Sequence, residues 1–130
     1  MPLNEQKQTT SQFEPVVVVK TYRIILGLYP LISKFPKIYK HTLGQEIQKN
    51  LIDILKHIFT ANAMPRPLRE TPLIEAASAC ETTKILLRLC LELGIFVNTQ
   101  YFQFSADLTE IGKMLGGWIG YVRTGKNIRA

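Results

Sequence analysis

The sequence predicts an all-α fold, an antiparallel, up-and-down bundle of four helices. Apolar residues recur three and four positions apart along four long segments, which is the spacing of one helix face. The connectors between these segments carry proline or glycine, which end helices. The chain has 130 residues, 46% of them hydrophobic, so it is long enough for one domain with a sizeable core. We assign the bundle to residues 15–123, with a flexible arm at 1–14 and a basic tail at 124–130.

The first helix is expected over residues 16–33. It opens with four valines, Val16–Val19, whose β-branched side chains favour a buried strand by propensity. The apolar positions that follow keep helical spacing, with Lys20 and Arg23 on the opposite face, and this pattern favours a helix. Pro30 is expected to kink or weaken the end of this helix.

The second helix is expected to follow a connector at residues 35–41. Thr42 and Gln45 have the spacing of a capping box, in which two side chains bond the first backbone amides of a helix. The helix is expected to end near Met64, because the proline-spaced linker at 65–72 cannot continue it.

The third helix is expected over residues 72–93, with Thr71 as its N-cap, Pro72 at its first position and Gly94 as its stop. Its second half is apolar on nearly all sides. The charged residues form one narrow line of Glu81, Lys84, Arg88 and Glu92. A lone bundle leaves about half of each helix in water, so this excess of apolar surface predicts that the protein forms oligomers.

The fourth helix is expected to be capped by Asn98 or Thr99 and to run to about Arg123. One face carries a stripe of small residues, and the neighbouring apolar seam carries a tryptophan. The stripe contains Gly112, Gly116 and Gly120, and the tryptophan of the seam is Trp118. Each glycine inside a helix costs about 1 kcal/mol relative to alanine, so we expect another backbone to approach this stripe closely. That contact lies either within the bundle or between subunits.

The composition is basic, with 16 Lys and Arg against 10 Asp and Glu and a net charge of +6. An excess of this sign is typical of proteins with a polyanionic partner, most often nucleic acid. Outside the third helix, the candidate contacts are Lys34, Lys37 and Lys40 in the first connector and Arg123, Lys126 and Arg129 near the C-terminus. Tyr39, between two of the lysines, is a candidate to stack on a base. The alternative is that these charges are only solvated.

The sequence offers no catalytic or metal-binding pattern. Neither histidine has the spacing of a metal ligand or of a nucleophile–base pair, and His57 is expected to pair with Asp53 on the helix surface. Cys80 and Cys90 lie too far apart on one helix for a disulfide and are expected to be buried thiols in a reducing compartment. We expect a non-enzymatic protein without metal or cofactor. With no signal peptide and no membrane-spanning run, we expect it in the cytoplasm.

Two parts of the sequence resemble known families. The segments LYPLISKFPK at 28–37 and TLGQEI at 42–47 are similar to the first half of the small four-helix bundle proteins encoded in ribosomal-RNA intervening sequences. The second motif of that group is missing at residues 59–64. The segment EIGKMLGGWI at 110–119 instead resembles a C-terminal run of the accessory variability determinant (Avd) proteins of diversity-generating retroelements.

The Avd resemblance implies four-helix bundles that assemble into a pentameric barrel with a basic surface. Such proteins bind the reverse transcriptase of the retroelement and nucleic acid, RNA and also DNA, and support error-prone copying of a template RNA into cDNA. Lys84 and Arg88 match the basic pair on the third helix of the family by their place, which makes them candidates to contact the polymerase or the RNA. The alternative is that they pair with the glutamates of the same helix. The alternative function is that of an intervening-sequence type of bundle with no role in reverse transcription.

Overall fold

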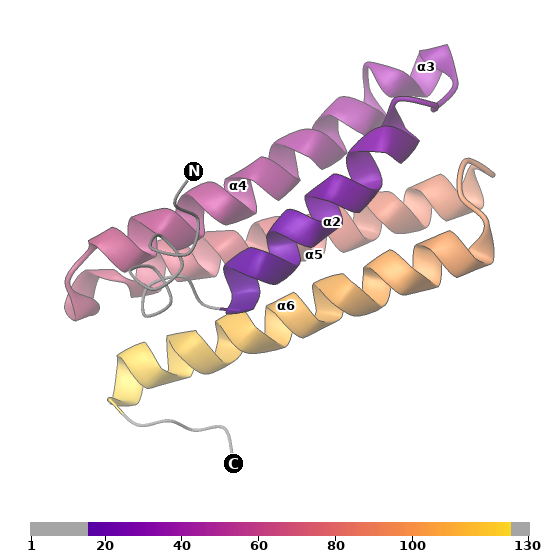
Figure 1. Cartoon of the computed structure of the whole chain (residues 1–130). Coiled ribbons are helices and arrows are strands. Elements are labelled where there is room, and N and C mark those ends of the chain that lie inside the picture. The colour runs from indigo at the N-terminus through magenta and orange to yellow at the C-terminus, as the bar shows by residue number, and fades with distance from the viewer. Residues whose placement is uncertain (1–15, 126–130) are drawn as a thin grey trace, which may run out of the picture.

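The computed structural model describes residues 16–125, and all its regular elements are helices. The long ones are α2 (Val16–Ile32), α4 (Leu43–Ala63), α5 (Glu70–Glu92) and α6 (Asn98–Thr124). Two short turns, α3 (Lys37–Lys40) and η1 (Arg66–Leu68), lie in the connectors. Consecutive long helices run in opposite directions, and α2 and α5 each pack against both α4 and α6 (Figure 1). The predicted four-helix bundle is confirmed for this part of the chain.

The predicted N-terminal arm at 1–14 lies outside the described residues. So do Lys126 and Arg129, the two candidate cations of the tail.

The core consists of aliphatic side chains that all four long helices direct inward. The side chains with no exposed surface include Leu28, Ile47, Leu51, Ile54, Ile58, Leu73, Leu87, Leu108, Ile111 and Leu115. Full burial of one such side chain contributes about 1.5–3 kcal/mol to folding, so this set is the main source of stability. The rings of Phe35 and Phe96 meet edge to face at 5.7 Å and extend the core beyond the long helices.

The four valines that open α2 are helical, as the spacing of the later residues predicted. Val17 and Val18 are buried, whereas Val16 and Val19 are exposed, which is the pattern of one helix face rather than of a strand. The helix continues through Pro30, which lies in its last turn.

Two of the predicted helix starts need correction. Thr42 does precede α4, but its hydroxyl donates to the carbonyl oxygen of Ile38 at 3.1 Å and caps no backbone amide. Helix α5 begins at Glu70, so Thr71 lies inside it and the predicted cap is wrong. The physical reason is the turn η1, which leads directly into α5 and brings the helical conformation forward to residues before Pro72.

The start of α6 also differs from the prediction. Neither Asn98 nor Thr99 is its cap; the residue before the helix is Val97, whose amide donates to the side-chain oxygen of Gln100 at 3.0 Å. The predicted stop of α5 is confirmed. Gly94 has a φ of +77°, a left-handed conformation that glycine adopts without strain.

Candidate nucleic-acid and partner interface

Charge is divided unevenly between two halves of the bundle. We call residues 16–64, with α2, α3 and α4, the basic half, and residues 65–125, with η1, α5 and α6, the neutral half. The basic half carries seven Lys and Arg against two Asp and Glu, a net charge of +5, whereas the neutral half carries six of each. The positive excess of the described residues therefore belongs to the basic half alone. A local excess of this kind favours the binding of a polyanion.

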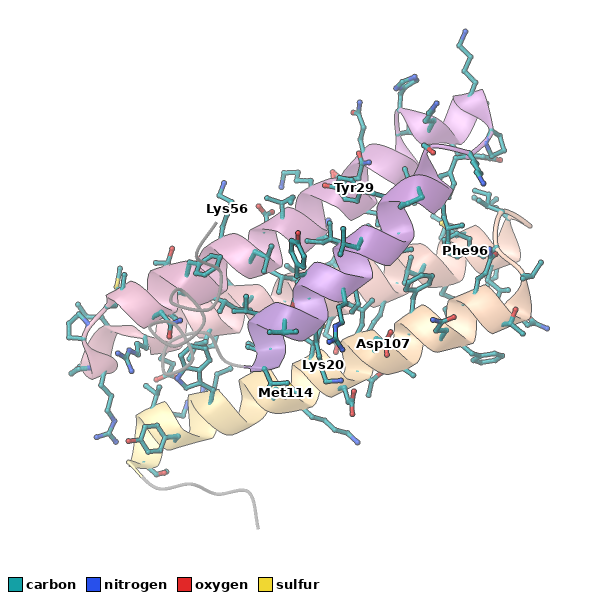
Figure 2. The ribbon with its side chains drawn as sticks, in the orientation of Figure 1. Lys20, Tyr29, Lys56, Phe96, Asp107 and Met114 are labelled. Atoms are coloured by element: carbon teal, nitrogen blue, oxygen red, sulfur yellow. The ribbon has the colours of Figure 1, made fainter. Side chains whose placement is uncertain are left out.

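Most cations of the basic half have no acidic partner among the described residues. Only two form ion pairs: Lys20 lies 2.8 Å from Glu110, and Lys49 lies 3.2 Å from Asp53. The remaining five are Arg23, Lys34, Lys37, Lys40 and Lys56. The side chain of Lys56 extends from α4 away from the bundle (Figure 2). Cations in this state can contact phosphate without first breaking an internal ion pair.

The three lysines of the predicted connector lie at the end of the bundle where α3 joins α2 to α4 (Figure 1). Lys34 and Lys37 are exposed and Lys40 is half-buried. Tyr39 is half-buried as well and packs against the core, so only part of its ring faces solvent. The structure therefore keeps the three lysines on one short segment but leaves little of Tyr39 free for stacking.

The candidate cations of the neutral half each have a carboxylate partner. These ion pairs join Lys84 to Glu81 at 3.4 Å, Arg88 to Glu92 at 3.1 Å and Arg123 to Glu70 at 2.6 Å. Exposed pairs of this kind contribute only about 0.2–1 kcal/mol, so Lys84 and Arg88 can still exchange their partners for another molecule. Arg123 differs because it ties the end of α6 to the start of α5.

The glycine stripe of α6 is open along part of its length. A β-carbon added at Gly116 would meet no atom within 4 Å, and one added at Gly112 would meet only Glu81 Oε2 at 3.9 Å. Gly120 is half-buried, and Trp118 is partly buried against the core. Among the helices that the structure describes, therefore, none approaches Gly112 or Gly116 closely enough to require glycine there.

Close approach inside the bundle occurs at two other glycines, which the sequence analysis did not single out. A β-carbon at Gly44 would lie 2.8 Å from Ile32 Cγ2, and one at Gly27 would lie 3.0 Å from the ring of Phe104. Isolated glycines in an amphipathic helix carry no pattern that distinguishes a tight contact from a tolerated one. Only the helix crossings identify them.

The excess of apolar surface that was predicted for the third helix is present on α5. Ile85 is 68% exposed, and Ile74, Leu89 and Leu93 are each 43% exposed. Residues 16–125 leave these side chains uncovered. The glycine stripe of α6 lies alongside, since Gly112 is next to Glu81 of α5.

Three titratable groups have a pKa that is shifted from its usual value, two buried thiols and one glutamate. Burial raises the pKa of the Cys80 thiol to about 11 and that of Cys90 to about 12, and both cysteines are free, as expected. The hydrogen bond and charge of Lys20 hold the pKa of Glu110 below its usual value. His57 Nδ1 lies 3.4 Å from Glu75 of α5, so the expected pairing of His57 with Asp53 is wrong.

Residues 16–125 contain no group of three or more His, Cys, Asp or Glu side chains placed to hold a metal ion. Within the same range, no helix is both long enough and apolar enough to cross a membrane.

One feature of the basic half was not predicted from the sequence, an apolar groove between α2 and α4. Its volume is about 420 Å³, and it is lined by Val18, Val19 and Tyr22 of α2 and by Leu55 and Phe59 of α4. The sequence does carry a signal for the positive charge of this half, since no acidic residue occurs between Pro15 and Gln45. The groove itself depends on how two helices cross, which no local pattern specifies.

The fold and this surface define a small helical-bundle protein with one strongly basic half and a neutral half that exposes apolar side chains. A family model described as bAvd-like matches residues 15–122, and the chain belongs to that family of Avd-type proteins. The match spans all four long helices except the last residues of α6. No curated protein and no solved structure matches the chain.

Proposed function

We propose that this protein is a non-enzymatic accessory factor of a diversity-generating retroelement. In this role it binds the reverse transcriptase of the element together with template RNA and cDNA, and it supports mutagenic copying of the RNA. The polymerase chemistry belongs to the partner. The observation that carries the proposal is membership of the bAvd-like family over residues 15–122.

The charge distribution supports the nucleic-acid part of the proposal. A net charge of +5 on one half, with five cations outside any ion pair to the described residues, suits the backbone of RNA or DNA. Binding of this kind depends on released counterions, so it weakens steeply as salt increases. The connector lysines, Lys34, Lys37 and Lys40, are the proposed phosphate contacts at one end of this half.

The neutral half supports self-association, and we propose a homo-oligomer, with five subunits as the expected number. The exposed Ile85 and Leu89 and the open stripe at Gly112 and Gly116 offer an apolar, smooth surface to a second copy. Contact between neutral halves avoids the repulsion that two +5 halves would generate. It also leaves the basic halves free for nucleic acid.

Lys84 and Arg88 are the proposed contacts for the polymerase. Their ion pairs with glutamates of α5 are exposed and weak, so a carboxylate or phosphate of a partner can replace those glutamates. The double variant K84E/R88E is expected to lose polymerase binding while its helix content, measured by circular dichroism, stays unchanged.

The test of the proposal is co-purification with the reverse transcriptase of a diversity-generating retroelement, followed by cDNA synthesis with and without this protein. Support requires a stable complex and cDNA that depends on the protein. Absence of any complex, together with no RNA binding at about 50 mM salt, would contradict the accessory role and leave an interaction protein of another kind.

A further inference from the structure

The groove between α2 and α4 combines three properties that bear on what it can bind. It is apolar, it carries two exposed aromatic rings, and it lies on the half of the bundle with a net charge of +5. Tyr22 is 56% exposed and Phe59 is 52% exposed, although both line the groove. Leaving two large aromatic side chains half in water costs hydrophobic free energy, so an occupant that covers them is favoured.

The charges around the groove restrict the chemistry of that occupant. Arg23 follows Tyr22 directly on α2, and Lys56 precedes Phe59 by one turn on α4. Both cations are exposed and form no ion pair with a described residue. Lys56 extends outward from the helix, as a side chain that reaches a backbone phosphate would (Figure 2). A second copy that presented its own basic half here would be repelled, and its neutral half is the surface proposed for contact with another neutral half.

Aromatic rings flanked by unpaired cations are the elements with which proteins bind single-stranded nucleic acid. The rings stack on base faces and the cations follow the sugar–phosphate backbone. A duplex cannot use the rings in this way, because its bases are already stacked and paired. The groove is open to solvent at its aromatic side chains, so a base can enter without rearrangement of the core.

We propose that Tyr22 and Phe59 form a base-stacking platform for single-stranded RNA or cDNA, with Arg23 and Lys56 holding the adjacent phosphates. The proposal rests on the proposed function, since it names the place where an accessory factor of reverse transcription holds an unpaired strand. It adds a preference for single strands, which a basic surface alone does not provide.

The test measures fluorescence anisotropy of a labelled oligouridine of about 15 nucleotides, and of a duplex of equal length, with the full chain at about 50 to 200 mM salt. We expect Tyr22→Ala and Phe59→Ala each to weaken single-strand binding on the order of tenfold. The slope of affinity against salt should stay unchanged for both, because stacking releases no counterions. Arg23→Gln and Lys56→Gln should instead lower that slope by about one contact each.

Two further variants separate stacking from other roles of the groove. Phe59→Leu keeps an apolar side chain but removes the aromatic face, so the proposal requires it to bind as weakly as Phe59→Ala. Phe102→Ala removes a ring that is 62% exposed on α6 in the neutral half, and its affinity should change less than about twofold. Circular dichroism confirms that each variant keeps its helices.

Four results would overturn the stacking proposal. The first two are full single-strand affinity of Phe59→Leu and equal affinity of the wild-type protein for duplex and single strand. The third is loss of polymerase binding by Tyr22→Ala or Phe59→Ala while RNA binding stays intact. The fourth is a change of oligomer mass in Tyr22→Ala. In each of them the wild-type protein still binds RNA or polymerase, so the proposed function survives. If the wild-type protein binds neither, the proposed function itself fails.

Discussion

The basic half and the neutral half of the bundle differ in the kinds of side chain that they leave available to a partner. The basic half carries five cations that form no ion pair with a described residue, and it exposes a groove with two aromatic rings. The neutral half pairs its candidate cations with carboxylates and exposes aliphatic side chains next to an open glycine stripe. Unpaired positive charge favours an anionic partner, whereas smooth apolar surface favours another protein surface. One small bundle thus offers two chemically distinct faces, the basic half for nucleic acid and the neutral half for protein surfaces, namely a second copy and the polymerase.

The strongest test of this division is to fill the glycine stripe. In the double variant Gly112→Leu and Gly116→Leu, bulky side chains would hold a second copy away from the neutral half. We expect light scattering to show the mass of the 14.8 kDa monomer, whereas the unmodified protein shows an oligomer. The matched control is Ala63→Leu, an exposed position of α4 in the basic half, which should keep the oligomer. An unmodified protein that is already monomeric would remove the assigned role of the neutral half.

The second test reverses charge on the basic half. The triple variant Lys34→Glu, Lys37→Glu and Lys40→Glu should weaken RNA binding on the order of 100-fold at about 50 mM salt, since each lost phosphate contact reduces counterion release. The comparison variant K84E/R88E alters cations that are already paired, so its effect on RNA should be clearly smaller. Equal losses in the two variants would show that the division into halves does not govern nucleic-acid binding.

The third test compares glycines of the two halves. Gly116→Ala fills open space on a helix, so it should stabilise the separated monomer by up to about 1 kcal/mol, measured by thermal unfolding at high dilution. Gly44→Ala should instead destabilise, because the new methyl group would lie too close to Ile32. A destabilised Gly116→Ala monomer would indicate a close contact within the chain.

The smallest effect concerns the ion pair between Lys20 of the basic half and Glu110 of the neutral half. The pKa of Glu110 is lowered in the folded protein by Lys20, so its contribution to stability is present above the unfolded pKa and is lost as the pH falls through the folded value. Lys20→Met should therefore reduce thermal stability slightly near neutral pH and make no difference in acid. Because Glu110 is exposed, a large effect at neutral pH would contradict this account.

Much of the fold was predictable, because the positions of the four long helices follow from periodic apolar residues. Leu51, Leu108 and Leu115 are buried where the spacing of three and four placed them. Helix starts were less predictable, since Thr42 and Thr71 have the residue type of a cap but not the surroundings of one. A cap depends on where the preceding turn directs the chain, and that direction is not encoded in the cap residue.

The candidate site was predictable in its charge but not in its geometry. Lys34, Lys37 and Lys40 were identified from sequence as a basic segment, and they do lie together at one end of the bundle. Tyr22 and Phe59 were not singled out from the sequence, because one aromatic residue on each of two helices forms no local pattern. Their common groove forms only when α2 crosses α4, and contacts between distant segments have no local signal.

The sequence by itself determined the helical class, the approximate extent of each helix and the net positive charge. These depend on spacing and composition, which act within one helix or over the whole chain. Only the tertiary structure decided that the excess charge of α2–α4 forms no ion pair within residues 16–125, that Gly27 and Gly44 allow close helix contacts, and that Gly112 and Gly116 stay open there. Those properties depend on which helix faces which, and that choice is made by packing the four helices together.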